Sequence, residues 1–181
     1  NEYSIIYINV IIRKIRNSRD SLTPEYIAGL IEGDGSLITP KIRDGKGKKR
    51  YPSIKIVFAI KDLPLALYIQ STFGGSVQYP KGNYIILSIQ SIVNVYNLMQ
   101  YVNGHFRTPK IDALHKIVNW FNINTNLDKV RRLGLSTSSI LTNGWLRGFI
   151  DTEGSFSIIF EISESTGYTI NIDLLMRISQ R

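Results

Sequence analysis

Residues 23–37 read TPEYIAGLIEGDGSL, and residues 142–156 read TNGWLRGFIDTEGSF. The two stretches align without a gap at an offset of 119 residues, and five of the 15 aligned positions are identical. Several other positions exchange residues of similar chemistry: Tyr26 for Trp145, Leu30 for Phe149, Glu32 for Asp151 and Asp34 for Glu153. Self-similarity of this kind indicates that one supersecondary unit occurs twice in the chain.

Each copy is predicted to form a helix that ends at a glycine and leads into a strand. Thr23 suits the N-cap, Pro24 the first helical position and Gly35 the helix end. Small residues four positions apart lie on one face of each expected helix: Gly29 and Gly33 in the first, Gly148 and Thr152 in the second. Because small side chains allow two backbones to approach closely, we expect the two helices to pack against each other.

Each repeat places a carboxylate in the last helical turn, Asp34 in the first copy and Glu153 in the second. A negative charge is unfavourable there, because the C-terminal end of a helix is the negative end of its dipole. If the helices pair in parallel, the two carboxylates also meet and repel each other unless a cation relieves them. One such residue alone would be interpreted as a solvated acid. The matched pair instead favours a divalent metal site, and oxygen ligands suit Mg²⁺.

The composition of the 181-residue chain narrows the chemistry further. Hydrophobic residues make up 43% of it, enough for a packed core, and the absence of Cys excludes a disulfide scaffold, a Cys-ligated zinc module and a cysteine nucleophile. The net charge is +8, and residues 1–122 hold 16 basic and 8 acidic side chains, whereas residues 123–181 hold 6 of each. This basic excess favours a polyanionic partner. No apolar run is long enough to span a membrane.

Three stretches give the chain its resemblance to a known family: IAGLIEGDG at residues 27–35, LRGFIDTEG at 146–154 and GHFRTPKIDALH at 104–115. They resemble the LAGLIDADG homing endonucleases, in the single-chain, two-motif branch encoded in fungal mitochondrial introns. The resemblance implies an α+β fold of αββαββα half-domains, each with a saddle-shaped antiparallel sheet. It also implies a mitochondrial origin, in line with the 29 Ile and 13 Asn against 4 Ala, which indicate an A/T-rich genome.

The expected order of elements divides the chain into four parts. Residues 1–19 form an N-terminal arm, 20–122 the first half-domain, 123–141 a polar linker and 142–181 the start of the second half-domain. Besides the two repeat helices, helices are expected at 62–73, 91–102 and 110–122, and strands at 36–41, 51–61, 76–80, 84–89, 155–163 and 168–179. By resemblance the second half should be about as long as the first, and about half of it is missing. The sequence is therefore expected to be a truncated form, a proteolytic fragment or one chain of a split protein, and a second polypeptide that completes the second half is a candidate partner.

The resemblance implies a site-specific endonuclease that cuts both strands of double-stranded DNA across the minor groove, with the sheet in the major groove. Asp34 and Glu153 would hold Mg²⁺, or another divalent cation such as Mn²⁺ or Ca²⁺. The backbone carbonyls of Gly33 and Thr152 would lie close to the same ions. Two active sites side by side would then serve one DNA strand each.

Two further residues match family positions near the scissile phosphate. Lys110 would polarise water and steady the phosphate, although a surface lysine at a helix start is the plainer interpretation. Gln180 would order active-site water. The counterpart of Lys110 in the second half falls beyond Arg181, so the second site is expected to be incomplete in this chain alone.

Basic and polar side chains are expected to hold the DNA. The loop between the first two strands would contact phosphates without sequence choice, through Lys41, Arg43, Lys46, Lys48, Lys49 and Arg50. A solvated charged loop is the alternative. Polar residues that alternate along the strands would face the bases in the major groove: Tyr51, Ser53, Lys55, Ser76, Gln78 and Ser88.

Two other functions remain open on the same scaffold. An RNA-binding maturase would help its intron to fold, with intron RNA as the partner, and such proteins can lose the metal carboxylates. A non-catalytic structural protein would retain the fold and cut nothing. Because this chain keeps both Asp34 and Glu153, DNA cleavage is the favoured hypothesis.

Overall fold

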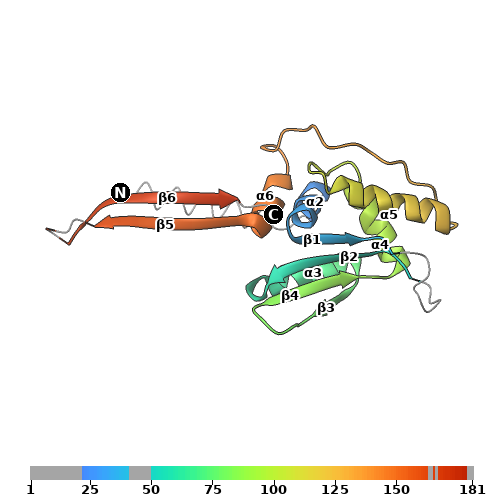
Figure 1. Cartoon of the computed structure of the whole chain (residues 1–181), viewed down its shortest axis with the longest axis horizontal. Coiled ribbons are helices and arrows are strands. Elements are labelled where there is room, and N and C mark those ends of the chain that lie inside the picture. The colour runs from blue at the N-terminus through green and yellow to red at the C-terminus, as the bar shows by residue number, and fades with distance from the viewer. Residues whose placement is uncertain (1–21, 41–49, 163–164, 166, 179–181) are drawn as a thin grey trace.

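The computed structural model describes residues 22–40, 50–162, 165 and 167–178 (Figure 1). These residues form a four-stranded antiparallel sheet, a two-stranded ribbon and a set of helices, which confirms the expected α+β class. The elements follow in the order α2 Pro24–Asp34, β1 Gly35–Ile38, β2 Ser53–Ala59, the 3₁₀ turn η1 Ile60–Asp62, α3 Leu63–Phe73, β3 Ser76–Gln78, β4 Tyr84–Ile89, α4 Ile92–Val102, α5 Ile111–Asn124, α6 Trp145–Glu153, β5 Gly154–Ile162 and β6 Thr169–Ile178.

Helix α2 begins and ends where the sequence predicts. The Thr23 side chain accepts a hydrogen bond from the Tyr26 amide at 3.3 Å, and Pro24 occupies the first turn, where its missing amide costs nothing. Strand β1 starts at Gly35, directly after the last helical residue. Asp34 is therefore held at a junction that is fixed by a helix on one side and a sheet on the other.

The four-stranded sheet has the order β1-β2-β4-β3, with every pair antiparallel. Its alternation is clear along β2, where Ile54, Ile56 and Phe58 are buried while Ser53 and Lys55 are partly exposed on the opposite face. The side chains on the buried face of the sheet pack together with residues of α3, α4 and α5 in one hydrophobic core. Burial of such aliphatic side chains, at about 1.5–3 kcal/mol each, is what holds helices and sheet together.

Strands β5 and β6 form a ribbon that projects from α6 away from the four-stranded sheet (Figure 1). Its register repeats that of β1 and β2, because Gly154 pairs with Ile178 as Gly35 pairs with Ile56. One face of the ribbon, hereafter the apolar ribbon face, carries exposed hydrophobic side chains: Phe156, Ile158, Phe160, Ile172, Leu174, Met176 and Ile178.

The boundaries differ from the sequence-based expectations in a few places. The strand expected at 51–61 ends at Ala59, since residues 60–62 form the 3₁₀ turn that leads into α3. The strand expected at 76–80 ends at Gln78, in keeping with Pro80, which has no amide to donate to a sheet. Helix α5 continues to Asn124, two residues into the linker expected at 123–141, and residues 125–144 then contain no helix or strand. The expected arm at 1–19 lies outside the described residues. Within the described ranges, no helix has both the length and the apolar character required to cross a bilayer.

Candidate active site at the paired helix ends

Helices α2 and α6 pack against each other through their backbones. A methyl group placed on Gly29 would lie 2.2 Å from the carbonyl oxygen of Trp145, and one placed on Gly148 would lie 2.2 Å from the carbonyl oxygen of Tyr26. The two contacts are related by the same 119-residue offset as the sequence repeat. The expected helix pair is therefore confirmed, with pseudo-twofold symmetry.

The same pairing continues to the C-terminal ends of both helices. A methyl group on Gly33 would lie 1.8 Å from the hydroxyl oxygen of Thr152 and 3.2 Å from Cγ of Glu153. Because Gly29 lies opposite Gly148 and Gly33 lies opposite Thr152, the helices run in parallel. Both carboxylates that the sequence singled out thus sit at the same end of the helix pair.

Lys110 lies just before α5 and reaches the end of α2. Its ammonium group donates hydrogen bonds of 2.7–3.1 Å to four backbone carbonyls, those of Ile31, Glu32, Gly33 and Gly35. An ammonium has three N–H groups, so all of them are engaged by the C-terminal turn of the helix. In this arrangement Lys110 acts as a cationic cap on the negative end of the α2 dipole.

Charge and burial oppose each other at this helix end. Burial lowers the pKa of Lys110, and the nearby charges of Glu153, Glu32 and Asp34 act in the other direction. Burial also raises the pKa of Asp34, although that side chain remains exposed, and the Lys110 charge partly offsets the effect. A carboxylate that is partly desolvated at the negative end of a helix gains stability from an added cation.

The residues at the helix ends match the preferences of a hard divalent cation. Asp34 and Glu153 bring carboxylate oxygens from two different helices, and backbone carbonyls lie beside them. Within the described ranges no group of three or more acidic, His or Cys side chains forms a self-contained metal cage. Mg²⁺ binds oxygen ligands and keeps several positions for water and phosphate, so two carboxylates are a fitting protein contribution.

The two carbonyls expected near the metal differ in their surroundings. The Gly33 carbonyl accepts a hydrogen bond from Lys110 at 2.8 Å, which leaves one lone pair. The Thr152 hydroxyl donates to the Phe149 carbonyl at 3.0 Å, so this side chain is engaged within its own helix. Any contribution of Thr152 to a metal would come from its backbone.

Glu32 is a polar residue at the site for which the sequence predicted no role. Its side chain is 0% exposed, and its carboxylate accepts hydrogen bonds from the amides of Arg107 and Thr108, the Thr108 hydroxyl and the indole of Trp145. The exchange of Glu32 for Asp151 in the repeat is the only signal in the sequence that marks it. A buried carboxylate with this many donors fixes the segments that supply them.

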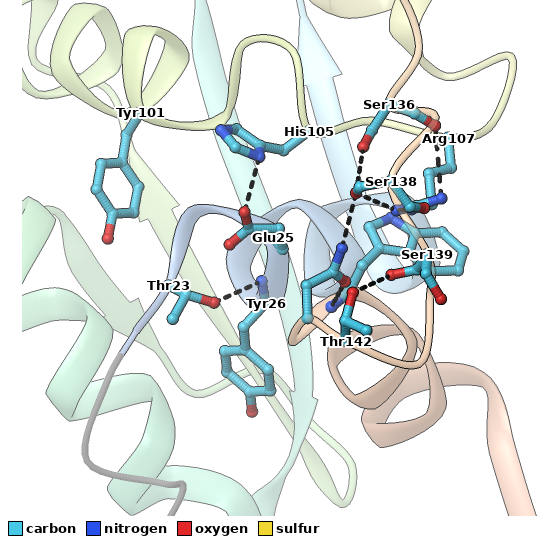
Figure 2. Close-up of polar contacts among 12 residues, drawn as sticks. Thr23, Glu25, Tyr26, Tyr101, His105, Arg107, Ser136, Ser138, Ser139 and Thr142 are labelled. Atoms are coloured by element: carbon cyan, nitrogen blue, oxygen red, sulfur yellow. Dashed lines mark hydrogen bonds and ion pairs between the residues drawn. The ribbon is translucent and has the colours of Figure 1, made fainter.

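The linker is tied to the start of α6 by polar contacts (Figure 2). The Arg107 guanidinium donates to the carbonyl and hydroxyl oxygens of Ser138 at 2.6 and 2.8 Å. The Asn143 amide also donates to the Ser138 hydroxyl, and its oxygen accepts from the Trp145 backbone amide. The linker therefore delivers α6 to α2 in a defined position.

The sheet face opposite the core carries most of the polar residues expected to read bases. Lys55 pairs with Ser88 and Ser88 pairs with Ser76, so the three lie in one row across β2, β4 and β3. Gln78 lies on the same face two residues further along β3. The expectation for Ser88 is wrong in one respect, since its side chain is 1% exposed and accepts a hydrogen bond from Gln90, which leaves it no surface for a base.

The remaining expected contact residues fall into two groups. Ser53 and Lys55 are partly exposed on β2, while Arg50 and Tyr51 are exposed just before it, where the Tyr51 ring meets the Trp120 ring edge-on at 6.1 Å. The other predicted contact residues lie outside the described residues: Lys41, Arg43, Lys46, Lys48 and Lys49. Gln180, predicted to order active-site water, also lies outside them.

Comparisons with known proteins find relatives of this chain. A family model described as LAGLIDADG endonuclease matches residues 27–121. The chain is 37% identical over 152 residues to the intron-encoded DNA endonuclease aI3 of Saccharomyces cerevisiae, a match that covers 77% of this chain and 36% of that protein. It is 29% identical over 138 residues to the intron-encoded RNA maturase bI4 of the same yeast, which covers 75% of this chain and 19% of that protein.

Solved structures share the fold. I-SmaMI bound to an uncleaved DNA target in the presence of calcium ions matches with a TM-score of 0.58 at 21% identity, over 88% of this chain and 68% of that one. Among the curated relatives, a cox1 intron-2 protein of Schizosaccharomyces pombe is 30% identical over 87% of this chain. The chain spans 36%, 22% and 47% of the lengths of three such relatives, and thus less than half of each.

Proposed function

Because the chain belongs to the LAGLIDADG endonuclease family, we propose that it forms the core of a site-specific homing endonuclease that hydrolyses one phosphodiester in each strand of double-stranded DNA. The observation that carries this proposal is the parallel pairing of α2 and α6 through Gly29 and Gly148. That pairing sets the carboxylates of Asp34 and Glu153 at one shared end of the helices.

Asp34 and Glu153 each bind a divalent cation in this proposal, Mg²⁺ in the cell and Mn²⁺ or Ca²⁺ as substitutes. The oxygen-only donor set and the unfavourable helix-end charge support that assignment. When bound, the cation supplies charge relief at the phosphorus and an activated water. Lys110 holds the end of α2 rigid and adds positive charge beside the phosphate, whereas Gln180 orders water at the second site.

The polar face of the sheet would hold the DNA. Lys55 and Gln78 are placed on a face of the kind that fits the major groove, and the register sets a second basic residue, Arg177, opposite Ser155 as Lys55 is opposite Ser36. The basic loop at residues 41–50 would add contacts to phosphates. We assign base recognition to the strands and sequence-independent affinity to the loop.

The apolar ribbon face indicates what else the active protein contains. Ile54 is 0% exposed beneath the helices of the first half, whereas Met176, at the equivalent position of the register, is 50% exposed. A contiguous exposed apolar face of this kind marks an interaction surface. We propose that helices of a completed second half cover it, supplied by further chain or by a second polypeptide.

Intron RNA binding is the second candidate function. It is favoured by the similarity to the RNA maturase bI4. Mitochondrial origin is part of both proposals and rests on intron-encoded relatives together with the excess of Ile and Asn over Ala, which is typical of an A/T-rich genome. The retained carboxylates favour cleavage as the primary activity.

The test uses the complete protein and DNA that carries its intron insertion site, with Mg²⁺ or with EDTA. Asp34→Asn and Glu153→Gln should each abolish double-strand cleavage and leave DNA binding in a gel-shift assay. Glu25→Gln is a matched control on the first turn of α2, where Glu25 pairs with His105 at 3.2 Å (Figure 2), and it should cleave like the parent. Cleavage by the double variant would refute the metal assignment, and absent cleavage with tight intron RNA binding would favour the maturase.

A further inference from the structure

The buried carboxylate of Glu32 joins three segments of the chain. Its Oε1 accepts hydrogen bonds from the Thr108 amide at 2.6 Å and the Thr108 hydroxyl at 2.7 Å, while the Arg107 amide reaches both oxygens at 2.9 and 3.0 Å. Its Oε2 accepts the indole N–H of Trp145 at 2.5 Å. A carboxylate that is fully removed from water is tolerated only with such partners, so these donors are held to it firmly.

On one side, Glu32 controls the approach to Lys110. The Thr108 hydroxyl donates a hydrogen bond to Glu32 and also accepts one from the Lys110 backbone amide at 3.3 Å. Helix α5 begins at the residue after Lys110. The Lys110 ammonium then returns to the end of α2 and caps its carbonyls, including that of Glu32 at 2.7 Å. Glu32 and Lys110 therefore close a ring of contacts around the last turn of α2.

On the other side, Glu32 holds the first residue of α6. The Trp145 ring is stacked on Phe149 with centroids 4.9 Å apart, and the Arg107 guanidinium lies 5.6 Å above it. The bond from the indole to Glu32 is buried, so it fixes the rotation of the ring against α2. A shift of α6 along α2 would break this bond.

The repeat supplies an internal comparison. Tyr26 and Asp151 are the counterparts of Trp145 and Glu32, and the Tyr26 hydroxyl donates to the Asp151 carboxylate at 2.8 Å. Asp151 is exposed, however, whereas Glu32 is buried. The aromatic–carboxylate bond thus occurs twice across the pseudo-twofold axis, and among the described residues the Glu32 side alone is also connected to a lysine.

We propose that Glu32 is a positioning residue that couples the placement of α6 to the placement of Lys110. The carboxylate acts through Thr108 on the lysine and through Trp145 on the helix that carries Glu153. Its consequence for DNA cleavage rests on the proposed function, whereas the coupling itself does not. The coupling can therefore be measured in the chain without DNA.

The first test measures how fast Lys110 is acetylated under native conditions, by quantitative peptide mass spectrometry, with Lys55 as an internal reference. Glu32→Gln removes the carboxylate charge and places an amide N–H₂ group among the hydrogen-bond donors that surround residue 32. The Lys110 ammonium should then be held less firmly and be acetylated about five-fold faster, the change in an equilibrium that the loss of one hydrogen bond produces. Thr108→Val removes only the hydroxyl link and should act in the same direction. Asp151→Asn is the matched control and should leave the Lys110 rate unchanged.

The second test observes the indole N–H resonances of the two tryptophans by NMR, with Trp145→Phe to assign them. Glu32→Gln should move the Trp145 resonance upfield, because a bond to a carboxylate is lost, and Thr108→Val should leave it in place. If Glu32→Gln does not fold, the Thr108→Val rate alone decides. Unchanged Lys110 reactivity in a folded Glu32→Gln or Thr108→Val variant would overturn the proposal.

In the complete protein, Glu32→Gln should lower kcat for cleavage and leave the Kd for DNA unchanged, whereas Asp151→Asn should retain more activity. If the parent protein does not cleave DNA but the acetylation and NMR results hold, the proposed function fails and the coupling stands. If the parent cleaves and Glu32→Gln changes neither Lys110 reactivity nor kcat, the coupling fails and the function stands.

Discussion

Replacement of Gly29 by alanine tests the contact on which the site depends. The added methyl carbon would lie 2.2 Å from the Trp145 carbonyl oxygen and 2.8 Å from the Phe149 amide nitrogen. Both neighbours are backbone atoms, so no side chain can rotate away. To bring the first separation to 3.0 Å, the lower limit of real Cβ contacts, α2 and α6 must move apart by at least 0.8 Å.

Two energies of opposite sign decide the outcome. Alanine is favoured over glycine inside a helix by about 1 kcal/mol. Overpacking that forces a backbone shift costs about 1–3 kcal/mol or more, and a shift of two helix backbones is at the upper end. We therefore expect Gly29→Ala to weaken the docking of α6 by about 1–2 kcal/mol.

The assay is urea unfolding of the 5-fluorotryptophan-labelled chain, followed by ¹⁹F NMR. Trp120 reports on the core of the first half and Trp145 on α6. Gly29→Ala should lower the midpoint of the Trp145 transition more than that of Trp120. Gly134→Ala is the control, since a methyl there meets nothing within 4 Å, and it should change stability by less than about 0.5 kcal/mol. A Gly29→Ala variant with the parental Trp145 midpoint would refute the backbone contact.

Three further outcomes follow from the site. Burial raises the pKa of Asp34, so ionisation of this carboxyl costs stability as the pH rises through the folded pKa. Asp34→Asn should therefore raise Tm slightly at pH 7 in EDTA, but not at about pH 3, where the carboxyl is protonated in both the folded and the unfolded state. A lower Tm at pH 7 would contradict this. Lys110→Met leaves four carbonyls without their donor and should destabilise the chain by about 1–3 kcal/mol in urea unfolding followed by circular dichroism, whereas an unchanged midpoint would show that water replaces the lysine. Lys55→Gln should reduce discrimination at one base pair by about 1–3 kcal/mol in competition binding and leave affinity for unrelated DNA nearly unchanged; equal losses on all sequences would make Lys55 a phosphate contact.

Local signals in the sequence were sufficient to predict the helix pair. Thr23, Pro24 and Gly35 define the bounds of α2 through chemistry that acts within one turn. Gly29 and Gly148 predicted the close approach because two matched copies are difficult to explain otherwise. Alternation along β2 likewise predicted which face of the sheet is buried, since register and burial share a period of two.

Features that depend on long-range contacts could not be predicted. Glu32 looks like a solvated helix acid until Thr108, 76 residues away, is placed against it. Ser88 has the right parity for the polar face, but its side chain is 1% exposed and accepts a hydrogen bond from Gln90, which strand parity alone does not indicate. The resemblance marked Lys110 as functional, yet only the fold shows that its ammonium is engaged by four carbonyls of α2.

The repeat also explains why the hairpins β1–β2 and β5–β6 have the same pairing register next to the helix-end glycine. Lys55 is paired with Ser36, one residue after the first helix-end glycine, and Arg177 is paired with Ser155 after the second. Because side chains alternate between the two faces of a strand, both basic side chains lie on the polar face. The serines that oppose them, Ser36 and Ser155, are two residues after Asp34 and Glu153. A change of register by one residue in either hairpin would turn its basic residue into the apolar layer. In both hairpins, the pairing that starts at Gly35 and Gly154 therefore places a basic residue opposite the serine that lies two positions after the helix-end carboxylate.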